Sequence, residues 1–150
     1  MTDAAEQDLI GLYSKRILAL AADIPHAGRL EGEASSARVR SPVCGSTVTV
    51  DLRVEDGRVA DFAQDVKACA LGQASAAVLG GAVIGLDRET LARGRDALRA
   101  MLKSGGPVPS APFEGYEALL PARDYKHRHA SILLAFDATL QAFDAAVAAA

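Results

Sequence analysis

The apolar positions of the N-terminal segment recur at intervals of three and four residues, which is the period of an amphipathic helix. Over residues 5–22 this apolar stripe consists of Leu9, Leu12, Tyr13, Ile17 and Leu20. The pattern stops before Pro25, and residues 25–36 are rich in Pro, Gly and Ser without any period. We therefore expect a helix over 5–22 and then a loop, in which Gly28 and Gly32 are candidates for positive φ angles.

From residue 37 the pattern changes to an alternation of apolar and polar residues, which is typical of half-buried strands. Three such runs occur, at 38–40, 47–54 and 58–62. An Asp-Gly pair at 56–57 separates the last two runs, and this pair between alternating segments is a strong hairpin signal. We therefore expect a three-stranded antiparallel sheet.

The remainder of the chain has helical patterns. Asp87 is a candidate N-cap, because it precedes an apolar stripe that continues to Leu102. We expect helices over 69–85, 87–102, 114–120 and from 125 to the end. The order of elements predicts an α+β fold in which a three-stranded antiparallel sheet packs against about five helices, in a single domain over residues 1–150.

Composition excludes several functions. Of the 150 residues, 50% are hydrophobic and 23% charged, which is the balance of a globular domain. The net charge of −3 argues against a dedicated nucleic-acid-binding protein. Gly, Asp or Arg interrupts the apolar runs before the roughly 18 residues that a membrane span needs, so we expect no membrane partner. The acidic N-terminal segment lacks the basic start of a signal peptide, so we expect a cytoplasmic protein.

Two cysteines, Cys44 and Cys69, carry the candidate chemistry. Cys44 lies in a Pro/Gly turn between the first two strands, and Cys69 lies where the third strand gives way to a helix. In an antiparallel meander both places are at the same end of the sheet, so the two thiols can approach each other. A helix N-terminus also favours a thiolate at Cys69. The alternative is that both cysteines are small buried hydrophobic residues.

Three segments resemble the signatures of the NifU/IscU/SufU family of iron–sulfur cluster scaffold proteins. Residues 41–46, Ser-Pro-Val-Cys-Gly-Ser before an apolar strand, are similar to the family's Asn-Pro-x-Cys-Gly-Asp. Residues 67–75, Lys-Ala-Cys-Ala-Leu-Gly-Gln-Ala-Ser, are similar to its Gly-x-Gly-Cys-Ala-Ile-x-x-Ala-Ser. Residues 128–136 begin Arg-His-Ala-Ser and continue as an apolar helix, which is similar to its Arg-x-x-Cys segment. The similarity spans residues 9–145, with a spacing that resembles the SufU-like branch.

The resemblance implies a SufE/NifU-like fold and a role in iron–sulfur cluster assembly. Family members hold a transient iron–sulfur cluster or a zinc ion with three cysteines and an aspartate, and they pass sulfur or clusters from a cysteine desulfurase to acceptor apo-proteins. The resemblance therefore implies that Cys44 and Cys69 bind iron, a cluster or zinc, and that either can accept persulfide sulfur. It places Ser46 and Ser131 at the positions of the aspartate and the third cysteine. A neutral hydroxyl is a poor ligand for zinc or iron.

Nearby residues are candidates to replace the two lost ligands. His127 lies four positions before Ser131 and thus on the same helical face, whereas His129 points away from it. His26 could complete a two-Cys, two-His site from its loop. The resemblance implies that Arg128 lies in the site, where it could neutralise a thiolate or persulfide. The alternative is that residues 126–129 are only the solvated basic start of a helix.

Three functions remain open at this point. The first is a scaffold or carrier that binds iron, a cluster or zinc through its cysteines. The second is a persulfide acceptor that binds no cluster. The third is a protein-interaction module that keeps the fold without the ligands. We expect no enzymatic activity beyond sulfur transfer.

Overall fold

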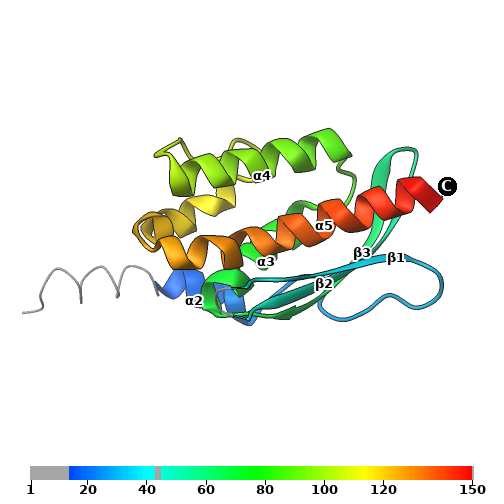
Figure 1. Cartoon of the computed structure of the whole chain (residues 1–150), viewed down its shortest axis with the longest axis horizontal. Helices are drawn as coiled ribbons and strands as arrows, with labels where there is room; N and C mark the ends of the chain where they lie inside the picture. The colour runs from blue at the N-terminus through cyan, green and yellow to red at the C-terminus, as the bar shows by residue number, and fades with distance from the viewer. Residues whose placement is uncertain (1–13, 43–44, 150) are drawn as a thin grey trace, which may run out of the picture.

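The computed structural model describes residues 14–42 and 45–149 (Figure 1). Its sheet has the strand order β1-β2-β3, and both neighbouring pairs are antiparallel. The strands are β1 (Ser35–Arg40), β2 (Thr47–Glu55) and β3 (Arg58–Lys67). The predicted α+β fold with a three-stranded antiparallel sheet is therefore confirmed.

The hairpin between β2 and β3 turns at Asp56 and Gly57, whose φ angles are 52° and 74°. Positive φ at both central residues is the geometry of a type I′ turn, and its twist matches that of the flanking strands. The Asp-Gly signal thus identified this turn correctly. β3 continues to Lys67 rather than ending at residue 62, because the buried Gln64 interrupts the apolar alternation on which that prediction depended.

Gln64 lies on the core side of β3, and its side-chain amide bonds to two backbone carbonyls. Nε2 donates to Pro25 O at 3.1 Å and to Ala76 O at 3.0 Å. The main chain of Gln64 also pairs with the segment beside it, because its N–H donates to His26 O and its carbonyl accepts from Gly28 N. A polar residue in the core therefore ties the loop before β1 to the edge of β3.

The helical elements are α2 (Lys15–Ala22), α3 (Ala70–Ala82), α4 (Arg88–Lys103), the 3₁₀ helices η1 (Glu114–Asp124) and η2 (Lys126–Arg128), and α5 (His129–Ala149). Asp87 caps α4 as predicted, accepting a hydrogen bond of 2.8 Å from Thr90 N. Of the helix expected over 5–22, only its second half lies within the described residues. The expected helix at 114–120 is a longer 3₁₀ segment, in which Pro121 supplies no N–H for an α-helical bond. The last helix begins at His129, after the separate turn η2.

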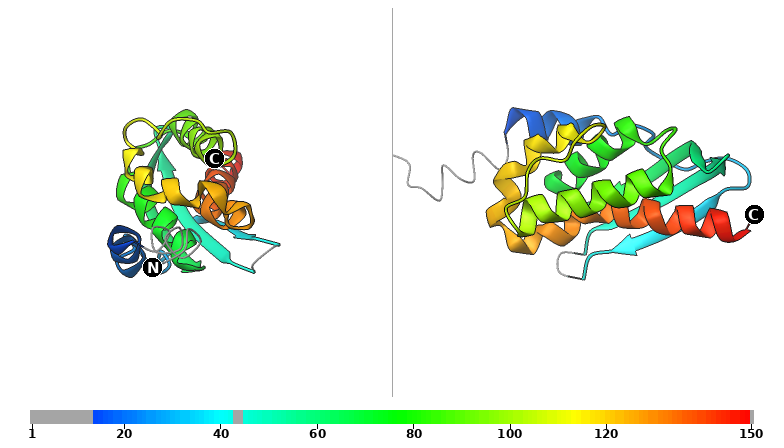
Figure 2. Two further views of the ribbon diagram at one scale, coloured as in Figure 1. Left: turned by 90° about the vertical axis from the view of Figure 1, so that its left-hand side faces the viewer. Right: turned by 90° about the horizontal axis from the view of Figure 1, so that it is seen from above.

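The elements form layers on one side of the sheet (Figures 1 and 2). α5 crosses β1 and β2 and also contacts α3 and α4, so it is the central helix of the fold. On β2, Val48, Val50 and Leu52 face these helices and are fully buried. α4 lies on the far side of α5 from the sheet (Figure 1).

The central position of α5 explains its composition. Residues Lys126–Ala149 are long and apolar enough to cross a membrane by length and composition, contrary to the expectation that every apolar run is too short. Half of the relevant window is buried inside the fold. Because α5 packs between the sheet and α4, the buried part of its apolar surface belongs to the core.

Candidate functional site

Cys69 is the N-cap residue of α3, directly after β3, with φ −66° and ψ 169°. Its side chain is half-buried and makes no capping hydrogen bond. The first N–H groups of a helix have no partner within the helix, and the helix dipole places positive potential there. Cys69 therefore lies at the positive end of the α3 dipole.

Two serine hydroxyls continue from the Cys69 sulfur into the interior. Cys69 Sγ lies 3.7 Å from Ser131 Oγ, and Ser131 Oγ donates to Ser46 Oγ at 3.1 Å. Ser131 is only 1% exposed and Ser46 only 5%. The three side chains come from α3, α5 and the turn before β2, so the fold brings together three segments that are distant in sequence.

Gly72 allows this close approach of α3 and α5. A Cβ at this position would lie 2.8 Å from both Ser131 Oγ and Ala68 Cβ. Such distances are too short for non-bonded atoms, so any larger residue would push the two helices apart. This role was not predicted from the sequence. Its only signal is a glycine three positions after Cys69 inside a predicted helix.

The turn between β1 and β2 is closed by two backbone hydrogen bonds. Ser41 N donates to Ser46 O at 2.8 Å, and Gly45 N donates to Ser41 O at 3.0 Å. Gly45 has a φ of 72°, which glycine adopts without strain. Cys44 lies outside the described residues, and Gly45 is its neighbour in the chain.

An open hollow of about 300 Å³ exposes the Cys69 side chain. Its lining residues are Gly45, Ser46, Lys67, Ala68, Cys69 and Arg128. The fold thus brings Arg128 to the hollow that Cys69 and Ser46 line. It also brings the cation Lys67 there, which was not predicted because the expected strand ends at residue 62 and β3 continues to Lys67. Of the residues that the structure describes, one thiol and two cationic residues line this hollow.

The histidines lie elsewhere. His127 is exposed in η2, with its ring 6.5 Å from the ring of Tyr125, and it is not a lining residue of the hollow. His26 has its ring edge-on to Phe62 at 6.0 Å. His129 is 1% exposed, and its Nε2 lies 2.9 Å from Ala122 O, so it is not part of a solvated basic segment. The metal-binding role of His127 stays a prediction.

Within the described part of the chain, the donor atoms near Cys69 do not fit a resident zinc ion. Besides the thiol, its described neighbours Ser46 and Ser131 present only neutral hydroxyls, whereas zinc sites use thiolate, imidazole or carboxylate groups. Across residues 14–42 and 45–149, no three His, Cys, Asp or Glu residues are grouped as a metal site. Carrying a persulfide requires fewer groups than binding zinc, because it needs only one accessible sulfur and a neighbouring positive charge.

Comparisons with known proteins agree with the sequence resemblance. A family model described as the NifU-like N terminal domain matches residues 12–130. A crystal structure of the N-terminal part of a nitrogen-fixing NifU-like protein from Brucella abortus is 44% identical, with a TM-score of 0.88 over 95% of this chain and 99% of that chain. A putative iron–sulfur cluster assembly scaffold protein for the SUF system from Fervidobacterium islandicum AW-1 shares the fold at 18% identity, with a TM-score of 0.79 over 89% of this chain and 98% of that one. A search of curated proteins gave no match.

Proposed function

The chain belongs to the NifU-like N-terminal domain family of iron–sulfur cluster assembly scaffolds, and we propose that it takes up sulfur for that assembly on Cys69. The donor is a cysteine desulfurase in the cytoplasm, and the recipients are acceptor apo-proteins. The observation that carries the proposal is the placement of the half-buried Cys69 thiol in an open hollow together with Lys67 and Arg128.

The transfer step conserves atoms and electrons. The Cys69 thiolate attacks the outer sulfur of the desulfurase's cysteine persulfide, and a new S–S bond forms on Cys69. The S–S bond on the donor breaks, and its electron pair leaves with the desulfurase thiolate. Cys69 then carries the persulfide. One S–S bond and one thiolate are present both before and after the step, so there is no net oxidation or reduction. No external oxidant or reductant is needed.

The surrounding residues support this step through charge and hydrogen bonding. Lys67 and Arg128 line the hollow and offset the negative charge of the thiolate and of the persulfide. Ser131 Oγ accepts from the neutral thiol, and after a hydroxyl rotation it donates to the thiolate while accepting from Ser46. On the correspondence that the sequence resemblance implies, these serines replace an aspartate and a cysteine, which favours sulfur transfer over tight metal binding.

Single-cysteine variants test the proposal. We expect Cys44→Ser to keep a persulfide on Cys69 after incubation with the desulfurase and free cysteine, and Cys69→Ser to lose most of it. Differential alkylation followed by mass spectrometry locates the added sulfur on each thiol. Persulfide formation and desulfurase turnover that do not change in the double variant Cys44→Ser/Cys69→Ser would contradict sulfur transfer and favour the protein-interaction module.

A second candidate function is the transient binding of iron or a cluster as cargo by Cys44 and Cys69. It is favoured by the hollow itself, because Gly45, which follows Cys44 in the chain, lines it together with Cys69. His127 is the predicted third ligand of this alternative. Anaerobic reconstitution with iron, sulfide and desulfurase tests it through cluster absorbance and iron content. Near-stoichiometric iron that disappears in Cys69→Ser supports cargo binding, and its absence from the wild type contradicts it.

A further inference from the structure

The face of the sheet that points away from the helices carries a cluster of charged side chains. Cross-strand pairing places Arg40, Thr47 and Lys67 in one row of this outer face, and Arg38, Thr49 and Asp65 in the next. Opposed residues of an antiparallel sheet lie on the same face. Arg38, Arg40 and Lys67 are exposed, so this half of the outer face is strongly basic although the whole chain carries a charge of −3.

The other half of the outer face is covered by the chain itself. Asp51 is 3% exposed there, and it accepts hydrogen bonds from Arg29 Nε at 2.7 Å and from Leu30 N at 3.1 Å. Two positions further along β2, Arg53 holds the following part of the segment before β1, because its Nε donates to Glu33 O at 2.8 Å. The loop over residues 29–34 therefore lies on the end of the outer face remote from Cys69. It leaves the Arg38 and Arg40 rows open to solvent.

The open half is concave, and it adjoins the sulfur site. Arg29, Arg38, Thr47, Thr49, Asp65 and Lys67 line a hollow of about 170 Å³. Lys67 also lines the hollow that contains Cys69, so the two depressions share one wall. Among residues 14–42 and 45–149, Arg38, Arg40 and Lys67 form no ion pair, so their charge is available to a partner.

We propose that this basic face, formed by Arg38, Arg40 and Lys67, docks a carboxylate-rich surface of the protein that delivers sulfur to Cys69. The inference rests on the proposed function, since it assigns the contact that places the donor. Unpaired cations at the rim of an interface act mainly by steering the encounter and by setting its salt dependence. Lys67 lines the Cys69 hollow, and Arg40 and Arg38 lie in the same and in the next row of the sheet, so a partner bound to this face lies next to the thiol.

A protein surface fits these features better than a free anion or a nucleic acid does. Two of the three cations, Arg38 and Arg40, belong to strand β1, where they alternate with core-facing residues. The charges therefore lie in a row along the strand and do not enclose a single small anion. Asp65 lies within the same hollow and repels a continuous phosphate backbone. A partner with separate carboxylates can avoid Asp65 and still pair with the arginines.

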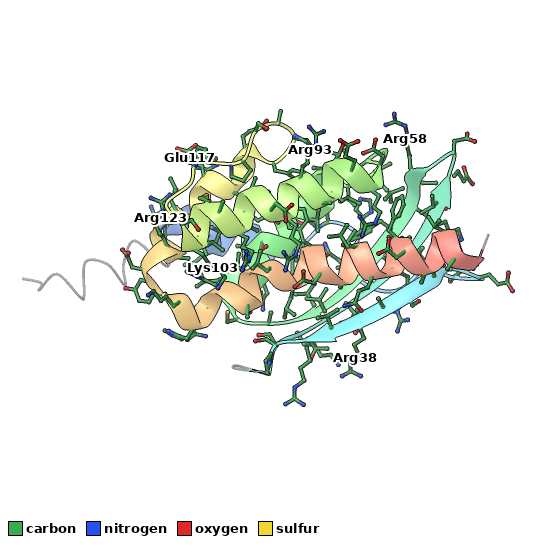
Figure 3. The ribbon with its side chains drawn as sticks, turned by 45° about the horizontal axis from the view of Figure 1, so that its top comes forward. Arg38, Arg58, Arg93, Lys103, Glu117 and Arg123 are labelled. Atoms are coloured by element: carbon green, nitrogen blue, oxygen red, sulfur yellow. The ribbon has the colours of Figure 1, made fainter. Side chains whose placement is uncertain are left out.

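Charge reversal on the two faces of the molecule tests the proposal. Arg38→Glu/Arg40→Glu reverses two charges of the basic face. The control, Arg93→Glu/Arg99→Glu, changes the net charge by the same amount at two exposed positions of α4. Figure 3 shows Arg38 below the sheet and Arg93 beyond α4, on opposite sides of the molecule. Each variant is checked for unchanged circular dichroism and melting temperature before use. The rate of Cys69 persulfide formation is then measured with the cysteine desulfurase and with a small persulfide donor such as cysteine hydropersulfide.

We expect the basic-face variant to lower the second-order rate with the desulfurase by about tenfold or more at low salt, and to leave the rate with the small donor unchanged. The α4 variant is expected to stay close to the wild type with both donors. Added NaCl is expected to slow the wild type with the desulfurase and to have little effect on the basic-face variant. Equal effects of both charge reversals, or equal losses with both donors, would overturn the proposal.

Binding without transfer separates this proposal from the proposed function. The Cys44→Ser/Cys69→Ser chain has no thiol, and its complex with the desulfurase is measured by biolayer interferometry with and without Arg38→Glu/Arg40→Glu. Loss of binding on charge reversal supports docking even if no sulfur is ever transferred. Unchanged binding overturns docking even if Cys69 accepts sulfur. A basic face that binds single-stranded oligonucleotide or inorganic phosphate more tightly than the desulfurase would also overturn it.

Discussion

The sulfur of Cys69 lies 3.7 Å from the hydroxyl oxygen of Ser131, although 62 positions separate the two residues in the chain. A hydroxyl at this distance accepts from a thiol and donates to a thiolate, so it serves both protonation states of the sulfur. A hydrogen bond to an ionised group is stronger than one to its neutral form. The pair therefore links the interior hydroxyl of α5 to the reactivity of the thiol at the start of α3.

Ser131→Ala is expected to slow the alkylation of Cys69 because it removes a donor to the thiolate. In a Cys44→Ser background, where Cys69 is the only thiol, we expect a decrease of about tenfold near neutral pH, which corresponds to the loss of one hydrogen bond to an ionised group. The pH profile of the iodoacetamide reaction measures the effect. Ser110→Ala, at an exposed position, serves as the control. A profile that is identical in Ser131→Ala and the control would show that the hydroxyl does not act on the sulfur.

Ser46→Asp/Ser131→Cys is expected to create a metal site. It replaces two neutral hydroxyls next to Cys69 with a carboxylate and a thiolate, which are ordinary zinc ligands. We expect zinc affinity to rise by about 100-fold or more over the wild type, and to rise less in either single variant. Competition with a chromophoric chelator measures it. If the double variant gains no affinity, the three segments do not converge closely enough for coordination.

Features that depend on neighbouring residues were predicted from the sequence, whereas contacts between distant segments were not. The turn at Asp56 and the cap at Asp87 were predicted, because each depends on residues that are adjacent in the chain. The end of β3 was not predicted, because Gln64 occupies a core position where the alternating pattern requires an apolar residue. Its side-chain amide bonds to the carbonyls of Pro25 and Ala76, which are distant in sequence.

The candidate site also combines a local feature that was predicted with long-range contacts that were not predicted from local pattern. Cys69 at the start of a helix was predicted from local pattern, and its proximity to Ser46 and Ser131 came only from the resemblance to a family. No rule of spacing brings a hydroxyl 62 positions away to the sulfur. The basic face was not recognised either, because its rows depend on strand register and on which half of the sheet the loop over 29–34 covers.

Asp51 is expected to make the stability of the fold depend on pH in the acidic range. The hydrogen bond from Arg29 is the main cause that lowers the pKa of this carboxyl from 3.8 to about 2, with further contributions from Ser36 and Leu30 N–H against the effect of burial. A carboxyl with a depressed folded pKa stabilises the protein above its unfolded pKa. This stabilisation is complete above about pH 5 and decreases as the pH falls through 4 towards 2.

Asp51→Asn removes that contribution, which is worth about 2 kcal/mol at neutral pH by linkage. We expect the variant to unfold at a lower urea concentration at pH 7, and its free energy of unfolding to fall less than that of the wild type between pH 5 and pH 3. Urea titrations at several pH values measure both. Asp124→Asn, at an exposed position, is the control. A parallel loss of stability in Asp51→Asn and wild type over this range would mean that the carboxyl does not titrate as inferred.

Two glycines of α3 are expected to respond in opposite directions to the same substitution. At Gly72 a new Cβ would meet Ala68 Cβ and Ser131 Oγ at 2.8 Å, so Gly72→Ala must shift α3 against α5 and is expected to cost about 1–3 kcal/mol. At Gly81 no atom lies within 4 Å of the new Cβ, so Gly81→Ala adds only helix propensity and is expected to stabilise by about 0.5–1 kcal/mol. Thermal or urea unfolding measures both changes.

The same pair separates a packing role of Gly72 from a role in the site. Because the shift at Gly72 moves Ser131 relative to Cys69, Gly72→Ala is expected to slow the alkylation of Cys69 in the folded protein under conditions where less than about one molecule in a hundred is unfolded. Gly81→Ala is expected to leave that rate unchanged, since it alters α3 at the end remote from Cys69. Stability loss without any change in the alkylation rate would mean that the helices separate while the contact between sulfur and hydroxyl persists. In that case the position of Ser131 is set by the turn before β2, through Ser46, rather than by the fit of α3 to α5.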